Sequence, residues 1–362
     1  MSTPQPVRFA ILGYGLHANR RMVPAFAGSK DTVLAGIWRR NQQAAAETCR
    51  QQNIPLNFPT REALCSSPEI DAVFIASPDA MHFDDALLAI RHGKAVLCEK
   101  PVAMDAAQAC KMAAAAAAAG VLYGVAQNFR FNLSVQLFRD WIAAGKIGTP
   151  LLAALQFCYP AQNSPRKWIA DPGVACGGPI GDVGIHCIDT LRYILAAEVL
   201  SVSTLATTAE PPASAAPVPI DPGAPALAVP DRPAPQPGAR KIETSASLQL
   251  EMSKNIAAHV TVTGRAPYRT LIEVTGSDGV LVAENGLTVD RPVEVQLRRA
   301  GELVESVPID NAAAYSIMLD SFAASLRTGA PFSATGADAI HNMNAIDAAF
   351  RSWRSGQREP AI

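Results

Sequence analysis

The chain has 362 residues, 49% hydrophobic and 17% charged, a composition typical of a packed globular protein of about two domains. Its 31 lysines and arginines balance 32 aspartates and glutamates, which gives no sign of a nucleic-acid or anionic-membrane partner. No apolar run has the length of a membrane span, residues 1–7 do not resemble a signal peptide, and seven cysteines form no Cys-x-x-Cys pair, so we expect a cytoplasmic protein with reduced thiols and no metal site.

The first 130 residues alternate short apolar runs with helical stretches. Strands are predicted at residues 7–12, 32–38, 71–76, 95–98 and 121–126. Helices are predicted directly after the first strand and at residues 41–52, 80–92 and 105–119. Strands that alternate with helices of about a dozen residues indicate parallel pairing. Residues 1–130 are therefore predicted to form an α/β domain with a doubly wound sheet.

The pattern changes after about residue 130. Helices are predicted at residues 133–144, 313–327 and 336–354. Strands are predicted at residues 151–159, 245–252, 256–263, 270–275, 279–283 and 292–298. Successive strands joined by short links pair antiparallel. Residues 131–362 are therefore predicted to form an α+β domain with a large open, mainly antiparallel sheet.

A Pro/Ala-rich segment at residues 209–240 interrupts the predicted sheet of this second domain, between residues 202–208 and residues 241–250. It holds ten of the chain's 28 prolines and few charges. Such a segment cannot pair as a central strand and favours extended polyproline conformations. A solvated surface excursion is the simplest interpretation, while a docking motif or an active-site lid stays open.

A glycine-rich loop follows the first strand: Gly13, Tyr14, Gly15, Leu16, His17 and Ala18. Glycine permits a tight turn and a close approach of the backbone to a pyrophosphate, and a helix N-terminus attracts the phosphate charge. The position between a strand and a helix favours a dinucleotide site over an ordinary glycine turn.

The second strand ends at Arg39 and Arg40, where NAD-binding folds often carry an acidic residue for the ribose 2′-hydroxyl. No acidic residue lies between Asp31 and Glu47. Guanidinium groups bind phosphate in bidentate fashion, so this pair favours NADP(H), with NAD(H) still possible. Two solvated surface arginines are the alternative.

Two further motifs carry groups suited to acid–base chemistry. Glu99 and Lys100 follow the fourth strand, at the carboxyl edge of the sheet, where a lysine can stabilise negative charge on a substrate oxygen. In the stretch 177–189, Asp182, His186 and Asp189 are spaced to share one helix face. A carboxylate one turn from a histidine can orient it and raise its pKa. A surface ion pair or a partial metal site remains an alternative for this helix.

Taken together, these features resemble the Gfo/Idh/MocA family of oxidoreductases. The resemblance rests on the glycine loop, residues 71–78 with His82, the Glu99-Lys100-Pro101 triplet, and residues 177–189. It implies an N-terminal Rossmann domain that binds NAD(P), and a C-terminal sheet whose outer face makes a homodimer or homotetramer. It also implies hydride transfer between a nicotinamide and a sugar, polyol or related carbonyl compound. The arginine pair and the segment 209–240 depart from the family pattern.

The resemblance also assigns roles to individual residues. Lys100 falls on the family's catalytic lysine, and Asp182 and His186 fall on its Asp-x-x-x-His pair. Ser77, Pro78 and His82 fall where the family lines the nicotinamide pocket, beside Glu99 and Lys100. Substrate contacts are expected from Asp182 and from four further residues: Asn128, Arg130, Tyr159 and Trp168.

These assignments predict that His186 exchanges a proton with the substrate oxygen while Lys100 stabilises charge on it. Two alternative functions remain open. One is a glycosidase that uses a tightly held NAD in transient redox, which the arginine pair disfavours. The other is a non-catalytic NADP-binding regulator, which the acid–base set disfavours.

Overall fold

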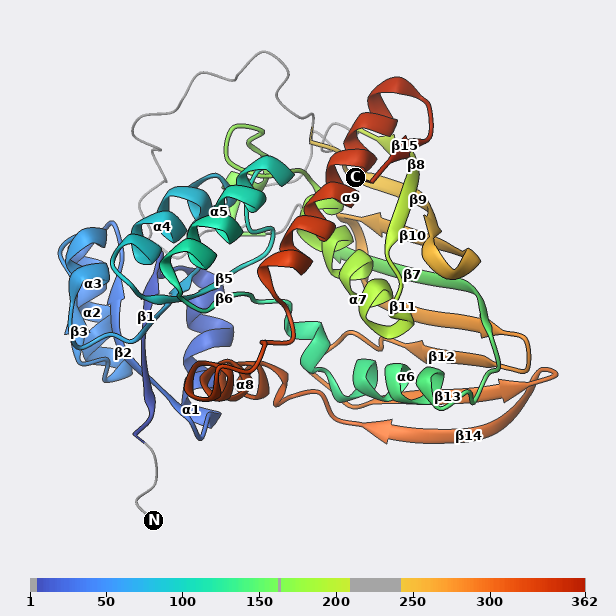
Figure 1. The fold of residues 1–362 in the computed structure, drawn as a ribbon, viewed down its shortest axis with the longest axis horizontal. Coiled ribbons are helices and arrows are strands. Elements are labelled where there is room, and N and C mark those ends of the chain that lie inside the picture. The colour runs from blue at the N-terminus through green and yellow to red at the C-terminus, as the bar shows by residue number, and fades with distance from the viewer. Residues whose placement is uncertain (1–4, 162–163, 209–241, 362) are drawn as a thin grey trace.

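The computed structural model describes residues 5–161, 164–208 and 242–361. Its strands form two sheets, sheet A on the left of Figure 1 and sheet B on the right. The Pro/Ala-rich segment at 209–240 lies outside the described residues. Within the described ranges, none of the helices is both long enough and apolar enough to cross a membrane.

Sheet A is parallel throughout, with strand order β3-β2-β1-β4-β5-β6. Its strands are β1 (Val7–Leu12), β2 (Thr32–Trp38), β3 (Leu56–Asn57), β4 (Ala72–Ile75), β5 (Ala95–Cys98) and β6 (Tyr123–Val125). Every residue of β4 and β5 is buried, because helices cover both faces of the sheet. The order reverses between β1 and β4, so a crevice for a ligand is expected at their carboxyl ends.

Helices flank sheet A above and below in Figure 1. They are η1 (Ala18–Met22), α1 (Val23–Gly28), α2 (Gln42–Gln52), α3 (Arg61–Ser66), α4 (Asp79–Arg91) and α5 (Ala106–Ala119). Asn41, Thr60 and Asp105 cap α2, α3 and α5 by accepting a backbone N–H in the first turn. These caps explain why the helices begin directly after the loops at the carboxyl edge of the sheet.

Sheet B has nine strands in the order β14-β13-β12-β11-β7-β10-β9-β8-β15. They are β7 (Pro150–Pro160), β8 (Val199–Thr207), β9 (Ser245–Met252), β10 (Ile256–Thr263), β11 (Arg265–Gly276), β12 (Val280–Glu284), β13 (Val293–Arg299), β14 (Glu302–Ile309) and β15 (Glu359–Pro360). The pair β7–β10 is parallel and the other pairs are antiparallel. The expected mainly antiparallel sheet is therefore confirmed.

Among the described residues, helices cover one face of sheet B. Figure 1 shows α6 (Leu133–Ala143), α7 (Ile185–Leu195) and α9 (Gly336–Ser355) against this inner face. The other helical segments of the C-terminal half are η2 (Asn128–Phe131), η4 (Lys167–Ala170), η5 (Ile180–Gly184), η6 (Ser253–Asn255) and α8 (Ala314–Thr328). Burial alternates residue by residue along β9 and β10, as expected for a sheet with one open face. Leu152 and Leu205 are among the apolar side chains exposed on sheet B.

The last two helices tie the two sheets together. α8 packs against α1 and β2, with the Phe322 ring 5.7 Å from the Phe9 ring of β1. The Val125 N–H of β6 donates to Ala334 O, just before α9. The α9 helix then packs against β8 of sheet B. The C-terminal half therefore completes the covering of sheet A, and the division of the chain near residue 130 stays a prediction.

The elements that were not predicted are β3, α3, β14, β15 and the short helices η2, η4 and η6. β3 and β15 have two residues each, too few for a hydrophobic pattern. β14 is an edge strand whose eight side chains are all at least partly exposed, so it lacks the buried face that marks a strand in a sequence. The helix with the Asp-x-x-x-His pair begins as a π-helical turn, η5, before α7 continues it.

Candidate active site

The backbone conformation and the close packing at position 13 both require glycine. Its φ is +91°, and a Cβ there would lie 2.4 Å from the Ser77 nitrogen. The N–H groups of Gly13 and Tyr14 both donate to Trp38 O at 3.2 Å. The loop is therefore fixed between the ends of β2 and β4, at the crevice that the strand order predicts.

Gly15 is exposed, and a Cβ added to it would meet only the Gly13 oxygen, at 3.9 Å. Protein packing does not require glycine here, but the close approach of a pyrophosphate would. η1 follows with no side-chain cap and no acidic residue in its first turn, so its N–H groups can receive an anion. These residues fit a dinucleotide.

The other loop side chains have structural partners. The Tyr14 hydroxyl donates to Asn19 Oδ1 at 2.9 Å, and burial raises the pKa of Tyr14 to about 12. Ala18 is buried and Leu16 is half-buried. The Tyr14 N–H already donates to Trp38 O, so Leu16 and Ala18 are the two of these residues that can serve a cofactor through their backbone N–H groups.

Arg39 and Arg40 follow β2 at the end of the crevice where a ribose would lie. Arg39 is half-buried, with Nη1 3.5 Å from Thr48 Oγ1, and Arg40 is exposed. No carboxylate stands at the end of β2 to bind a ribose hydroxyl. The arrangement suits a phosphate better than two hydroxyls.

The cofactor contact predicted for His82 stays a prediction, and both of its ring nitrogens already lie against backbone oxygens. Its side chain is buried, with Nδ1 2.7 Å from Pro101 O and Nε2 2.7 Å from Ser77 O. The Ser77 hydroxyl donates to Asp85 Oδ2 at 2.7 Å, and Pro78 directly precedes α4. The His82 ring therefore links the turn at Ser77, which lies beside Gly13, to the turn at Pro101, which follows Lys100.

Glu99 connects the glycine loop with the lysine. Its Oε1 lies 2.9 Å from His17 Nε2, and its Oε2 accepts the Lys100 N–H at 3.2 Å. Burial opposes ionisation of Glu99, but His17 and Lys100 together hold its pKa below the ordinary value. The Glu99 carboxylate is therefore already bonded to His17 and to the Lys100 N–H.

Lys100 lies at the centre of the site. Its Nζ donates to Asp182 O at 2.9 Å and lies 3.3 Å from Asp182 Oδ1. The contact joins the end of sheet A to the π-helical turn η5, residues 82 positions apart in the chain. An ammonium has three N–H bonds, so one more can point to a substrate oxygen.

The Asp182 carboxylate gathers donors from three segments. It accepts from Tyr159 at 2.8 Å and from Arg166 at 2.9 Å, besides its contact with Lys100. Burial would raise the pKa of Asp182, but Arg166 and Lys100 hold it far below the ordinary range. Asp182 is therefore an ionised anchor. Tyr159 lies beside it, and its contact with substrate stays a prediction.

Arg166 was not among the predicted site residues. The structure brings its guanidinium onto Asp182, with the side chain 32% exposed and 5.9 Å from the Trp168 ring. A single arginine in a polar loop gives no sequence signal for such a position. Arg166 is thus the site residue that sequence reasoning missed, and Trp168 lies beside it.

His186 has a different charge state from the one predicted. Burial, and then the nearby Lys100, lower the pKa of His186 well below the ordinary value, and Asp182 does not offset them. Asp182 favours the protonated ring, but its effect on the pKa is smaller than that of burial and Lys100. His186 is 6% exposed, its ring lies 4.4 Å from the Phe129 ring, and its Nδ1 is buried without a hydrogen-bond partner among the described residues. The ring is neutral at neutral pH.

Asp79 is a further buried carboxylate beside the site. Its Oδ2 accepts the Cys176 N–H at 3.0 Å. Burial raises the pKa of Asp79 to about 6, while His82 and Lys100 oppose the rise. At neutral pH it is largely ionised, and it adds a second negative charge near Lys100 and Arg166.

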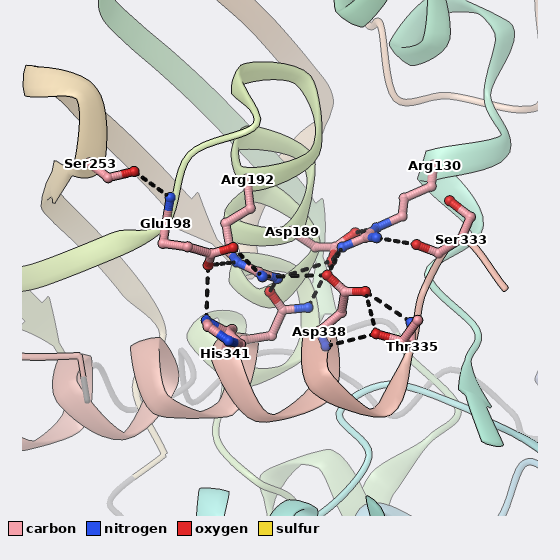
Figure 2. Close-up of polar contacts among 10 residues, drawn as sticks. Arg130, Asp189, Arg192, Glu198, Ser253, Ser333, Thr335, Asp338 and His341 are labelled. Carbon is pink, nitrogen blue, oxygen red and sulfur yellow. Dashed lines mark hydrogen bonds and ion pairs between the residues drawn. The ribbon is translucent and has the colours of Figure 1, made fainter. Parts of the chain in front are cut away.

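Arg130 is not available to substrate, which corrects the prediction. Figure 2 shows it in a buried network. Its Nε and Nη2 bind both oxygens of Asp189 at 2.8 and 2.6 Å, and Nη2 also donates to Asp338 at 2.9 Å. Asp189, predicted on the same helix face as His186, turns away from the site to Arg130 and Asn342. This network fixes α7 against η2 and α9.

Asn128 keeps its predicted place near the site. It is buried, it precedes the Phe129 that packs on His186, and its Nδ2 finds no partner among the described residues. A buried amide of this kind calls for a polar ligand. Asn128 therefore remains a candidate for a cofactor or substrate contact.

Comparison with known proteins gives two matching family models. A model described as "Oxidoreductase family, NAD-binding Rossmann fold" matches residues 7–127. A model described as "GFO/IDH/MocA C-terminal domain" matches residues 135–282. Together the two models span most of the chain and follow one another in the order that the fold shows.

Whole-length relatives carry names of the same kind. A 1,5-anhydro-D-fructose reductase of Ensifer adhaerens is 27% identical over 97% of this chain and 97% of that protein. An inositol 2-dehydrogenase of Rhizobium meliloti is 27% identical over 96% of each. The crystal structure of an aldose-aldose oxidoreductase from Caulobacter crescentus has a TM-score of 0.83 and 22% identity, and the match covers 98% of this chain and 100% of that one. This last likeness concerns the fold.

Proposed function

The chain belongs to the Gfo/Idh/MocA family of oxidoreductases, and on that premise we propose that it transfers hydride between NADP(H) and a neutral sugar, polyol or related carbonyl compound. The observation that carries the proposal is the contact of Lys100 with Asp182, beside His186 and at the crevice of a dinucleotide-binding sheet. The names of two whole-length relatives, a sugar reductase and an inositol dehydrogenase, support the substrate class.

When bound, the nicotinamide supplies the hydride donor or acceptor. The neutral ring of His186 is suited to accept the proton of a substrate hydroxyl. The Lys100 ammonium stabilises negative charge that develops on the same oxygen. In carbonyl reduction the same groups work in reverse, with His186 protonated first. The buried setting of His186 therefore favours alcohol oxidation at neutral pH.

Asp182, Tyr159 and Arg166 would orient the rest of the substrate. Their three side chains form hydrogen bonds that substrate hydroxyls can share or replace. Lys100 and Arg166 are balanced by Asp182 and by the largely ionised Asp79. The site thus has no excess of positive charge for a phosphate, which supports a neutral, hydroxyl-rich substrate.

The cofactor choice rests on Arg39 and Arg40. A guanidinium can bind a 2′-phosphate and stack on an adenine, whereas a ribose hydroxyl is usually held by a carboxylate. The end of β2 offers arginines and no carboxylate, which supports NADP(H) over NAD(H).

The exposed face of sheet B supports the proposed homodimer or homotetramer. Leu152, Leu200 and Leu205 are 56%, 45% and 73% exposed there, more than expected for solvated strands of a monomer. Sedimentation equilibrium would test this proposal, and a monomer at micromolar concentration would contradict it.

The direct test is to follow cofactor absorbance with a panel of polyols, inositols and anhydro sugars, for the wild type and for His186→Ala. We expect reduction of NADP⁺ by one group of the panel, and a loss of turnover of about 10²–10⁴ in the variant with cofactor affinity retained. His259→Ala, on the exposed side of β10, is the matched control. A His186→Ala variant with near-wild-type turnover would remove His186 from the reaction. Cleavage of glycosides without net redox would replace the proposal with the glycosidase.

A further inference from the structure

Glu243 is a buried carboxylate that directly follows the Pro/Ala-rich segment. It is 1% exposed. Its Oε1 accepts the Ile180 N–H at 2.6 Å, and its Oε2 accepts the Gly178 N–H at 3.0 Å. A Cβ on Gly178 would lie 2.0 Å from the Glu243 backbone oxygen, so the two backbones are in contact. The start of the helix that carries Asp182 is therefore held by a residue far away in the chain.

The helix start has no local cap. Pro179 stands at the N-cap of η5 and makes no side-chain cap hydrogen bond. The first N–H groups of a helix need an acceptor, and a carboxylate there also gains from the helix dipole. Glu243 supplies that acceptor from the strand side of the molecule, which links the position of η5 to the inner face of sheet B.

The helix start is in turn bonded to the reacting groups. The Asp182 N–H donates to Gly178 O at 2.9 Å, and Asp182 O accepts Lys100 Nζ at 2.9 Å. Two hydrogen bonds thus separate the residues that Glu243 holds from the ammonium of Lys100. The charge of Glu243 also adds to burial in raising the pKa of Tyr159, the residue that donates to Asp182.

The backbone next to Glu243 is also connected by hydrogen bonds to the segment that carries Arg166. Thr244 O accepts the Gly264 N–H at 3.0 Å, and Gly264 O accepts the Ala161 N–H at 2.8 Å. Ala161 begins the segment that carries Arg166. The residues around Glu243 therefore contact both chain segments that converge on Asp182.

We propose that Glu243 is a positioning residue, which fixes the start of η5 so that Asp182 and Lys100 meet in the geometry that the reaction needs. The inference rests on the proposed function of Lys100 and Asp182. A displacement of about 1 Å at such groups can cost about 10²-fold in rate. Glu243 touches neither the glycine loop nor the arginines of β2 in any contact described above, so its effect should fall on turnover and spare cofactor binding.

The test compares Glu243→Gln and Glu243→Asp with a matched control. Gln keeps the shape but turns an N–H donor toward one of the two backbone N–H groups. Asp347→Asn is the control, because Asp347 Oδ2 accepts the Ala106 N–H and so is a carboxylate that holds a different helix start, that of α5. For each full-length protein we would measure kcat, KM, the Kd of NADPH, and hydrogen exchange of the amides at 176–186.

We expect Glu243→Gln to lower kcat about 10- to 100-fold with the NADPH Kd within twofold. The amides from Gly178 to Asp182 should exchange faster, and Glu243→Asp should recover part of both losses. Asp347→Asn should speed exchange at the start of α5 and leave kcat unchanged. Wild-type kcat in Glu243→Gln, despite faster exchange, would overturn the proposal, and so would equal losses of kcat in the control.

Failure of the proposed function would be visible separately. If the wild type turned over none of the polyols, inositols and anhydro sugars, hydrogen exchange would still test whether Glu243 holds the start of η5. An unchanged exchange rate at Asp182 in Glu243→Gln would overturn it, and faster exchange confined to 178–186 would support it.

Discussion

The proposed role of His186 depends on its charge state. The spacing of Asp182 and His186 predicts a histidine with a raised pKa, whereas burial and Lys100 lower it. Asp182 does favour the protonated ring, but burial and Lys100 outweigh it. A neutral ring is a proton acceptor, which fits the proposed alcohol oxidation.

This charge state has a consequence for the pH dependence of the reaction. Because the pKa of His186 lies below 6.5, the ring stays deprotonated as the pH falls from 8 to 6.5, and the base is lost only at a lower pH. We expect kcat/KM for alcohol oxidation to be level across that range, with its acid limb below pH 6.5. A profile that falls by tenfold between pH 8 and 6.5 would contradict the neutral His186.

Arg39 gives a prediction on cofactor choice. A charge-assisted hydrogen bond contributes about 1.5–3 kcal/mol, so Arg39→Ala should weaken NADPH binding roughly 10- to 100-fold and leave NADH binding nearly unchanged. Calorimetry of both cofactors measures the two effects. Arg50→Ala, an exposed arginine on α2 paired with Glu47, is the control and should change neither affinity. Equal weakening of NADPH and NADH would argue against a 2′-phosphate contact.

At the scale of the element, the buried strands were the most predictable part of the fold. Residues 72–76 and 95–98 form continuous apolar runs because both faces of β4 and β5 are covered. Edge strand β14 has no buried residue, so it lacks the buried face that marks a strand in a sequence. The π-helical start of α7 was equally invisible, since its geometry depends on contacts with Glu243 and Lys100.

The site was predictable where its residues stand in motifs. Lys100, Asp182 and His186 follow from spacing and resemblance, and their convergence is what parallel strands and an inner helix impose. Arg130 and Arg166 were not predictable, because each is defined by a partner distant in the chain, Asp189 for the first and Asp182 for the second. A local pattern does not show which arginine will be buried in an ion pair and which will face a ligand.

The buried network of Figure 2 gives a prediction on stability. Asp189→Asn leaves the guanidinium of Arg130, 5% exposed, without its bidentate partner. Breaking a buried pair on one side costs about 3–5 kcal/mol, and the remaining contact with Asp338 should keep the loss at the lower end, about 3 kcal/mol. Urea unfolding measures it. Glu305→Gln, in a surface pair with Lys146, should cost under about 1 kcal/mol. Similar losses in the two variants would refute this view of the network.

At the scale of the whole molecule, the C-terminal half both covers sheet A and supplies half of the site. α8 and α9 return to sheet A, while η5 and the segment of Arg166 bring their side chains to the end of β5. Lys100 from the first half of the chain and Asp182 from the second half therefore meet between the two sheets, and neither half holds both groups.

The same arrangement predicts that residues 209–241 can be shortened. Thr244 donates to Thr207 O at 2.8 Å, so the described residues on either side of this segment already lie together. Replacing residues 209–241 with a short Gly/Ser linker should retain the fold and raise the free energy of unfolding by roughly 1–2 kcal/mol through loop-closure entropy. Thermal unfolding and turnover measure the result. A stable variant that loses turnover would favour an active-site role for the segment over a surface excursion.

The central claim is that the crevice of sheet A holds NADP(H) for exchangeable redox use. Calorimetric titration of the purified protein with NADPH and with NADH, together with identification of any cofactor released on denaturation, tests it most directly. We predict that NADPH binds at least about tenfold more tightly than NADH, in keeping with a charge-assisted phosphate contact, and that it exchanges freely. A tightly retained NAD, or no binding of either cofactor, would contradict the account.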